Sequence, residues 1–183
     1  CAVPIPEGIS YEQACIITDG VATPFHALRS RGALKAGESV AVVGCGGLGT
    51  HAILLARMMG AGFIVAIDVD ASARDRSVAL GADLALNPRE EKNIGKSIRQ
   101  RIGRGVDLAL ECVGRAETVA AALQTLDTGG RAIIVGVGPE KPELPPLIRF
   151  VGREFSELGS FGMDKRDIAD LLFVRTCDDL HDR

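Results

Sequence analysis

The sequence predicts an α/β fold, a doubly wound parallel sheet of six strands, on the strength of three observations. Short, continuously apolar runs alternate with longer segments of helical period, and such runs are typical of strands buried on both faces of a parallel sheet. The first run leads directly into a glycine-rich turn at residues 44–49, which a helical pattern follows. Strand–helix–strand connections are right-handed in nearly all proteins. This rule gives the strand order 3-2-1-4-5-6 of the Rossmann fold.

Two helices are expected before the first strand, within a lead-in segment at residues 1–36. Ser10 begins a helix over 11–18, because Gln13 stands at the position that completes a capping box. Thr23-Pro24 begins a second helix over 25–31, since proline is favoured in the first helical turn.

The strand–helix alternation occupies residues 37–175, which we interpret as one Rossmann domain. The apolar run at 147–151 is interpreted as an edge strand, and the polar residues 176–183, which show no period, as an irregular tail. Strands are expected at 39–43, 63–67, 84–86, 106–111, 131–137 and near 157–161, and helices at 48–59, 72–80, 90–102, 117–126 and from 165 to about 174.

The glycine-rich turn has the spacing G-x-G-x-x-G of a dinucleotide-binding site. Gly44 allows the tight turn out of the strand, Gly46 lets the backbone approach a pyrophosphate, and Gly49 lets the helix pack close to the sheet. The free N–H groups at the start of the helix favour a phosphate. Asp68 ends the second strand, where a carboxylate accepts hydrogen bonds from ribose hydroxyls and repels a 2′-phosphate. The pattern therefore predicts NAD as the cofactor in preference to NADP.

Composition argues against several other classes of protein. The net charge of -3 gives no reason to expect nucleic acid or an anionic membrane as a partner. No apolar run approaches the roughly 20 residues that span a bilayer. The five cysteines form no C-x-x-C pair, so neither a zinc cluster nor a disulfide framework is indicated, and a cytoplasmic location is expected.

Several polar residues outside the motif have simpler interpretations. His26 is expected to pack or to lie at the surface, and Asp70 to cap a helix. Cys45 and Cys112 are interpreted as small fillers of the core. The charged residues at 165–170 are interpreted as a solvated helix face.

The runs at 18–28 and 32–49 resemble the zinc-type medium-chain alcohol dehydrogenases, and the likeness continues through Gly81-Ala82-Asp83, Glu111-Cys-Val-Gly114 and Val135-Gly-Val137. It covers roughly residues 1–170. The resemblance implies reversible hydride transfer between NAD and a small alcohol or aldehyde. It also implies a separate catalytic domain of GroES-like fold, which carries most of the zinc ligands and has no counterpart in this sequence.

The resemblance also implies roles for individual residues. The pyrophosphate turn would comprise Gly44, Gly46, Gly47, Leu48 and Gly49. Asp68 would bind the adenosine ribose and Val69 would lie against the adenine, with Val113, Gly114 and Arg115 beside the adenosine. The nicotinamide would meet Thr23, Val135, Gly136 and Val137, and the backbone of Ser160 and Phe161 would hold its carboxamide.

Asp19 departs from the pattern of this family, because many members have a zinc-binding cysteine at that position. Aspartate is also a zinc ligand, so Asp19 is a candidate metal ligand. The departure equally fits a zinc-independent branch, or a residue that caps the following helix. The resemblance further implies a homodimer in which the run at 147–151 extends the sheet between subunits. The alternative is a monomer in which the loop at 140–146 covers this edge.

Three other functions stay open at this point. A zinc-independent quinone or enoyl reductase of the same superfamily would show a strong preference for NADPH. A non-catalytic NAD-binding module would need no catalytic residues. A methyltransferase uses a related sheet, but the complete glycine motif argues against it. The sequence does not identify the substrate.

Overall fold

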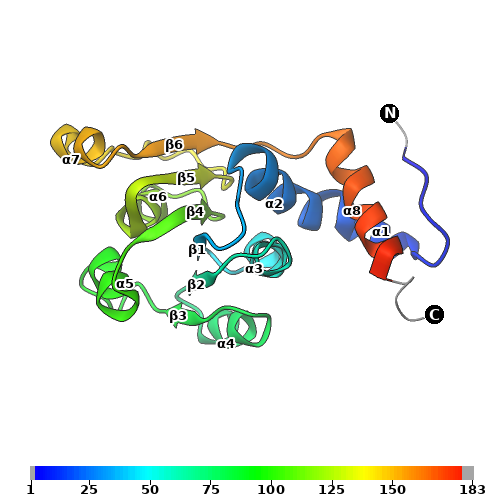
Figure 1. Ribbon diagram of the computed structural model, residues 1–183, viewed down its shortest axis with the longest axis horizontal. Coiled ribbons are helices and arrows are strands. Elements are labelled where there is room, and N and C mark those ends of the chain that lie inside the picture. Colours follow the sequence, from blue (N-terminus) through cyan, green and yellow to red (C-terminus); the bar gives the residue numbers. More distant parts are fainter. Residues whose placement is uncertain (1–2, 179–183) are drawn as a thin grey trace.

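The computed structural model describes residues 3–178, with side chains described through Leu172, and a sheet forms its centre. The strands are β1 (Ser39–Val43), β2 (Phe63–Ile67), β3 (Leu84–Leu86), β4 (Val106–Glu111), β5 (Leu126–Ile134) and β6 (Ser156–Gly159). Their order is β3-β2-β1-β4-β5-β6, and each neighbouring pair is parallel (Figure 1). The predicted fold class and strand order are confirmed. The carboxyl ends of all six strands therefore meet at one edge of the sheet.

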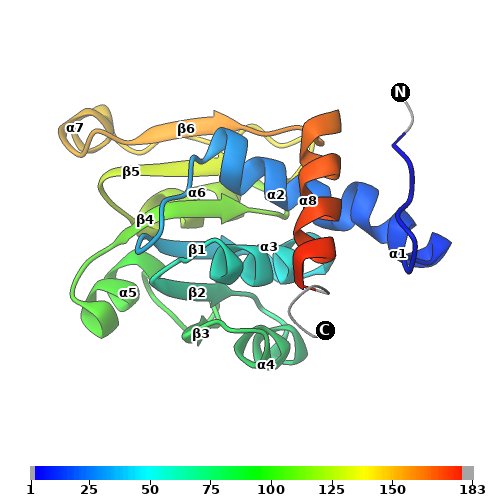
Figure 2. The ribbon, with the colours of Figure 1, turned by 45° about the vertical axis from the view of Figure 1, so that its right-hand side comes forward.

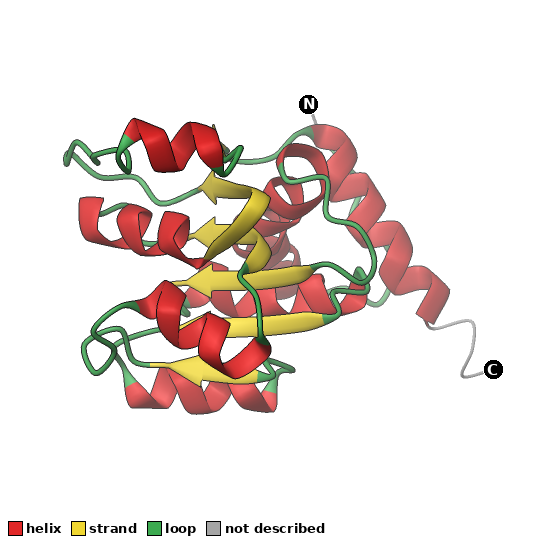
Figure 3. Cartoon of the chain, turned by 60° about the vertical axis from the view of Figure 1, so that its left-hand side comes forward, coloured by secondary structure: helices red, strands yellow, loops and turns green. Residues whose placement is uncertain are grey.

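Helices connect the strands and cover both faces of the sheet (Figure 3). They are α1 (Tyr11–Ile16), α2 (Ala22–His26), α3 (Gly47–Met58), α4 (Ala71–Ala79), α5 (Ile94–Ile102), α6 (Ala116–Thr125), α7 (Leu147–Gly152) and α8 (Lys165–Asp178), with two π-helical turns, η1 (Ile17–Val21) and η2 (Ala27–Arg31). Within the described range, no helix is both long and apolar enough to cross a bilayer.

The sheet separates two apolar cores, and β1 serves both of them. Val40 and Val42 pack in the core that α2 and α3 cover, whereas Ala41 and Val43 pack in the core under α5 and α6. Successive side chains of a strand point to opposite faces, so a strand between two cores is apolar at every position. All five residues of β1 are buried, as the continuous apolar run predicts.

The lead-in segment forms one helical stretch from α1 through η2. Ser10 and Gln13 form the predicted capping box, in which Gln13 N donates to Ser10 Oγ at 3.3 Å and Ser10 N donates to Gln13 Oε1 at 3.2 Å. Pro24 lies inside α2 instead of at the start of a separate helix. Proline has no N–H, and the wider turns η1 and η2 on either side of α2 accommodate the interrupted bonding. The division of the chain at residue 36 stays a prediction.

Helix α8 packs against the lead-in segment and is hydrogen-bonded to it. Figure 2 shows α8 beside α2, with which it makes contact. His26 Nδ1 lies 2.6 Å from Asp167 Oδ2, and Ser30 Oγ donates to Asp167 Oδ1 at 3.4 Å. Asp167 is only 2% exposed, so its assignment to a solvated helix face is wrong. A buried carboxylate needs such donors, because leaving it unpaired would cost several kcal/mol.

The run at 147–151 is not an edge strand; it forms α7. Arg149 N and Phe150 N both bond to Pro146 O, which starts a helical turn directly after the proline. Phe150 packs edge-on against Phe155, with ring centroids 6.3 Å apart, and this contact holds α7 against the start of β6. A five-residue apolar run fits either type of element, and here local bonding decides for the helix. The edge strand on this side is β6.

Several element boundaries also differ from the prediction, and β5 begins at Leu126 instead of residue 131. α5 begins at Ile94 instead of residue 90, because Asn93 Oδ1 accepts from Lys96 N at 2.8 Å and caps the helix. β5 ends at Ile134 because the N–H groups of the next two residues both bond to the carbonyl of Glu111. α8 continues through Asp178, so residues 176–178 of the expected irregular tail are helical, and residues 179–183 lie outside the described residues.

Candidate functional site at the carboxyl edge of the sheet

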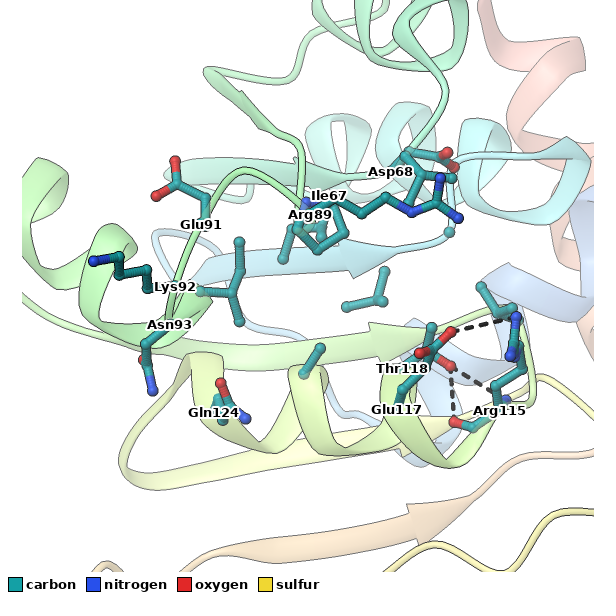
Figure 4. A pocket seen from close by; sticks show the side chains of 17 residues that line it. Ile67, Asp68, Arg89, Glu91, Lys92, Asn93, Arg115, Glu117, Thr118 and Gln124 are labelled. Atoms are coloured by element: carbon teal, nitrogen blue, oxygen red, sulfur yellow. Dashed lines mark hydrogen bonds and ion pairs between the residues drawn. The ribbon is translucent and has the colours of Figure 1, made fainter.

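A cavity of about 420 Å³ lies at the carboxyl edge, where Figure 4 shows it from close by. β1, β2 and β4 end in it, α6 forms one wall, and the segment between β3 and α5 forms another. The switch in strand order between β1 and β4 is where ligands bind in open α/β sheets. The lining residues are Val43, Gly44, Ile67, Asp68, Val69, Pro88, Arg89, Glu91, Lys92, Asn93, Ile94, Val113, Arg115, Glu117, Thr118, Ala121 and Gln124.

The glycine turn has the geometry that each of its glycines requires. Gly44 has φ +87°, and a Cβ there would lie 2.4 Å from Val113 Cγ2. A Cβ on Gly49 would lie 1.9 Å from the carbonyl oxygen of Gly44, so this position packs backbone against backbone. At Gly46 and Gly47, by contrast, a Cβ would have no atom of the described chain within 4 Å. Gly46 is the N-cap of α3 and no side chain caps it, so the N–H groups that a helix leaves unpaired in its first turn begin beside this open space, which suits an anion.

Asp68 is held in place by the glycine turn itself. Cys45 N donates to Asp68 Oδ2 at 2.7 Å, and Asp70 N donates to Asp68 Oδ1 at 2.8 Å. Each carboxylate oxygen can accept more than one hydrogen bond, so both oxygens can still accept from a ligand hydroxyl. Arg74 Nη1 donates to the carbonyl oxygens of Asp68 and Val69 at 2.9 and 3.0 Å, which fixes the backbone around the acid.

The turn after β4 forms the opposite side of the cavity. Gly114 has φ +85°, which glycine adopts without strain. Arg115 forms ion pairs with Glu117 at 3.3 Å and with Glu140 at 3.7 Å, and Figure 4 shows the Arg115–Glu117 pair beside the opening. Val113 is 41% exposed and presents an apolar surface to the cavity. Val69 faces the same cavity, so two apolar side chains and the Asp68 carboxylate come together there.

The residues assigned to the nicotinamide lie outside this lining. Val135, Gly136 and Val137 follow β5, and Ser160 and Phe161 follow β6, so they occupy the same edge farther along the sheet. Val137 and Phe161 are 80% and 91% exposed. Ser160 is buried, and its Oγ has no hydrogen-bond partner among the described residues.

Asp19 is exposed and bonded to a residue of the same helical stretch. Thr23 is buried, and its Oγ1 donates to Asp19 Oδ1 at 3.0 Å, so two predicted site residues are joined. Within residues 3–178, the potential metal ligands that cluster in threes are His26, Asp164 and Asp167, and Asp19 is not among them. Since a zinc site uses about four ligands, the described residues do not form a complete one around Asp19.

The two cysteines near the site are unsuited to act as nucleophiles. Burial raises the pKa of the Cys45 thiol, and the nearby Asp68 carboxylate raises it further. Burial also raises the pKa of Cys112, together with the charge of Glu111. Because the thiolate is the reactive form of cysteine, both side chains stay unreactive, as their interpretation as core fillers requires.

Sequence reasoning missed part of the cavity wall. The segment that contains Arg89, Lys92 and Asn93, together with Thr118 and Gln124 on α6, lines the cavity but was not predicted. The strand topology could have predicted this wall, since the segment after β3 must start from the same edge of a parallel sheet as the glycine turn.

The lining carries three basic residues (Arg89, Lys92, Arg115) and three acids (Asp68, Glu91, Glu117), so the opening has no strong charge of one sign.

Comparison with known proteins identifies the family. A family model described as zinc-binding dehydrogenase matches residues 47–174. The chain belongs to the zinc-binding dehydrogenase family. Within this family, the chain is 30% identical over 159 residues to sorbitol dehydrogenase of Rattus norvegicus, covering 86% of this chain and 44% of the relative. It is 33% identical over 150 residues to S-(hydroxymethyl)glutathione dehydrogenase of Synechocystis sp., covering 80% of this chain and 41% of that protein.

Solved structures of dehydrogenases share the fold. The alcohol dehydrogenase of the archaeon Aeropyrum pernix superposes with a TM-score of 0.83 at 30% identity, over 96% of this chain and 52% of that one. The 2R,3R-butanediol dehydrogenase of Bacillus subtilis gives a TM-score of 0.84 at 29% identity, over 93% and 48%. This zinc-binding dehydrogenase chain thus spans less than half the length of the curated relatives it matches.

Proposed function

We propose that the chain is the cofactor-binding part of an NAD-dependent oxidoreductase that transfers hydride between NAD and a small alcohol or aldehyde. The observation that carries the proposal is the Asp68 carboxylate, which the glycine turn holds at the mouth of the cavity through Cys45 N at 2.7 Å. The hydrogen bond from Cys45 N to Asp68 thus links the proposed pyrophosphate-binding turn to the proposed ribose-binding acid. Membership of a dehydrogenase family supports the reaction class.

The chain's residues would position the cofactor along the carboxyl edge. The pyrophosphate would lie over Gly46 and Gly47, where open space meets the free N–H groups of α3. The ribose hydroxyls would donate to Asp68, and the adenine would lie between Val69 and Val113 in the cavity. We call this cavity the adenosine side.

The other end of the cofactor would extend past β5 and β6. Val137 would face the nicotinamide ring, and the backbone of Ser160 and Phe161 would hold the carboxamide. We call these ends of β5 and β6 the nicotinamide side. When bound, NAD supplies the hydride acceptor at its nicotinamide ring, and this chain's residues orient that ring.

The experiment that tests the proposal is calorimetric titration of the 183-residue chain with NADH and, separately, with NADPH. A 2′-phosphate would approach the Asp68 carboxylate, so NADH should bind at least roughly tenfold more tightly than NADPH. Binding of neither nucleotide would contradict the proposal. A preference for NADPH would contradict the role of Asp68 and favour a quinone or enoyl reductase.

A zinc-independent reductase is a second candidate, because Asp19 has no cluster of other potential ligands around it in the described part of the chain. Asp19 stays a candidate ligand, and one carboxylate would be this chain's contribution to a shared site. Zinc content and NADH oxidation measured for Asp19→Ala and for the parent chain, each with a catalytic domain of the family supplied in trans, separate the two. Equal zinc content would remove Asp19 from the metal site.

We further propose that the chain forms a homodimer through the outer side of β6 and α7. Leu147, Ile148 and Val151 on α7 are 68%, 86% and 69% exposed, an apolar group next to an edge strand. Free strand edges and exposed apolar patches favour pairing with a second copy. Analytical ultracentrifugation should show a dimer that Ile148→Glu converts to a monomer. A monomer for the unsubstituted chain would contradict the proposal.

A further inference from the structure

Glu111, the last residue of β4, is a fully buried carboxylate at the carboxyl edge. Its Oε1 accepts from Val113 N at 2.8 Å, from Gly114 N at 2.9 Å and from Thr118 Oγ1 at 2.7 Å. Three donors on one oxygen offset part of the cost of burying a charge. The same side chain thereby fixes the turn after β4 and the first turn of α6.

The backbone carbonyl of Glu111 binds the neighbouring strand end. Val135 N donates to it at 2.9 Å and Gly136 N at 3.1 Å. This one residue therefore holds the turn that borders the adenosine side through its side chain, and the segment of the nicotinamide side through its backbone.

Glycines make the connection rigid. A Cβ on Gly136 would lie 2.1 Å from Gly114 N, and a Cβ on Gly138 would lie 2.0 Å from Gly114 O, so the two segments touch backbone to backbone. On the other flank, Val113 fills the space that a side chain at Gly44 would need. The turn after β4 thus packs against the glycine turn on one side and against the segment after β5 on the other.

The burial of the second carboxylate oxygen excludes direct contact between that oxygen and the cofactor. Glu111 Oε2 is buried and has no hydrogen-bond partner among the described residues. An oxygen that is closed off from solvent does not meet a nucleotide bound at the surface. Any effect of Glu111 on binding must therefore pass through the backbone groups and the Thr118 hydroxyl that it holds.

We infer that Glu111 is a positioning residue that sets the adenosine turn and the nicotinamide segment relative to each other. The inference rests on the proposed function, because it takes the cavity as the adenosine site. A core residue with a purely structural task at a buried strand end would ordinarily be apolar. A carboxylate at this place instead provides acceptors for the otherwise unpaired N–H groups of a turn that faces the ligand.

The test compares Glu111→Ala, Glu111→Gln and a matched pair of threonine variants on the 183-residue chain. Thr118→Val removes the hydroxyl that bonds Glu111, and Thr125→Val removes a buried hydroxyl at the far end of the same helix, where Oγ1 bonds Ala122 O at 2.6 Å. NADH affinity is titrated well below the melting temperature of each variant. The emission spectrum of bound NADH is recorded at saturation, where it reports the nicotinamide side independently of affinity.

We expect Glu111→Ala to weaken NADH binding roughly tenfold or more, since two backbone donors lose their acceptor. The emission of bound NADH should move toward that of free NADH. Glu111→Gln should stay within about threefold of the parent, because the amide oxygen still accepts from the turn. Thr118→Val should weaken binding by a few-fold, whereas Thr125→Val should lower the melting temperature alone.

Two results would overturn the inference in different ways. If the parent chain binds NADH and the Glu111→Ala and Thr118→Val variants bind it equally well, Glu111 is a stability residue only. Should Glu111→Ala fail to fold, unchanged binding and emission in Thr118→Val would lead to the same conclusion. A parent chain that binds neither NADH nor NADPH would overturn the proposed function, and the role of Glu111 with it.

Discussion

On the adenosine side, side chains from three strand ends, α6 and the segment before α5 wall a cavity of about 420 Å³, whereas on the nicotinamide side Val137 and Phe161 stand 80% and 91% exposed. Both sides lie at the carboxyl edge of the same parallel sheet. Under the proposed function, this chain would enclose one end of the dinucleotide and offer a single surface to the other. We therefore expect most of the cofactor affinity of this chain to reside on the adenosine side.

The largest effect that tests this comparison is expected at Gly49. Gly49→Ala would place a Cβ 1.9 Å from the carbonyl oxygen of Gly44, so α3 must move away from β1. Unfolding free energy, measured by urea denaturation, should fall by roughly 3 kcal/mol, at the upper end of overpacking costs. Gly46→Ala is the control, because a Cβ there has open space in the described chain. It should leave stability unchanged and weaken NADH binding; a loss of stability in both variants would contradict the separation of roles.

Asp68→Ser combined with Val69→Arg should reverse the charge that the adenosine ribose meets. Removal of the carboxylate relieves the repulsion of a 2′-phosphate, and the new guanidinium attracts it. The ratio of NADPH to NADH affinity, measured by titration, should rise roughly tenfold, equivalent to about 1.4 kcal/mol. Val137→Arg on the nicotinamide side is the control and should leave the ratio unchanged. An unaltered preference in the double variant would disprove the assigned role of Asp68.

Asp107, at the amino edge of the sheet, should matter for stability but not for binding. Burial opposes ionisation of this carboxyl, but hydrogen bonds from Ser39 N and Oγ and the charge of Arg104 hold its pKa below the ordinary value of 3.8. Because the pKa is lower in the folded state, the ionised carboxylate stabilises the fold above about pH 4, and this stabilisation is lost as the pH falls through the folded-state pKa. Asp107→Asn should lower the unfolding free energy by about 1 kcal/mol at pH 7.

The same variant gives a signature in its pH dependence. The stability difference between Asp107→Asn and the parent, measured by urea denaturation from pH 7 downward, should shrink below about pH 4. NADH affinity at pH 7 should be equal in the two proteins. A difference in stability that does not depend on pH would show that the Asp107 charge is not responsible.

The smallest expected effect is the difference in affinity between ADP-ribose and NADH. ADP-ribose lacks the nicotinamide ring, so its affinity reports the adenosine side and the pyrophosphate turn alone. It should bind within about threefold of NADH, a difference of about 0.6 kcal/mol. If NADH binds more than about a hundredfold more tightly, the nicotinamide side contributes far more than its exposed surface indicates.

The parts that sequence predicted are those with a repeating or fixed local rule. The strand order follows from apolar runs, helical connections and right-handed crossovers, and the backbone contacts at Gly44 and Gly49 follow from the spacing of the glycine motif. The prediction of an edge strand at 147–151 was wrong because so short an apolar run has no period that separates strand from helix. The prediction that Asp167 lies on a solvated helix face was wrong because its partner His26 lies far away in sequence. Polar periodicity carries no information about such a contact.

The candidate site was predictable only where it belongs to a motif. Asp68 stands at a fixed distance after the glycine turn, so its place was predicted. Arg89 and Lys92 lie in an irregular polar segment whose path depends on the packing of α5, and no local pattern marks them. Glu111 looks like any acid at the end of an apolar strand, and only the hydrogen bonds that its side chain and its carbonyl accept distinguish it.

The contact between His26 and Asp167 joins residues 141 positions apart in the chain. During synthesis, α8 emerges after the lead-in helices and every strand of the sheet, so this contact forms only after the residues between them have left the ribosome. Until then the buried side of α2 lacks its last partner. Contacts of such long range are slow to form, and the segment that carries Asp19 and Thr23 is therefore made before the sheet but secured only after α8 has been made.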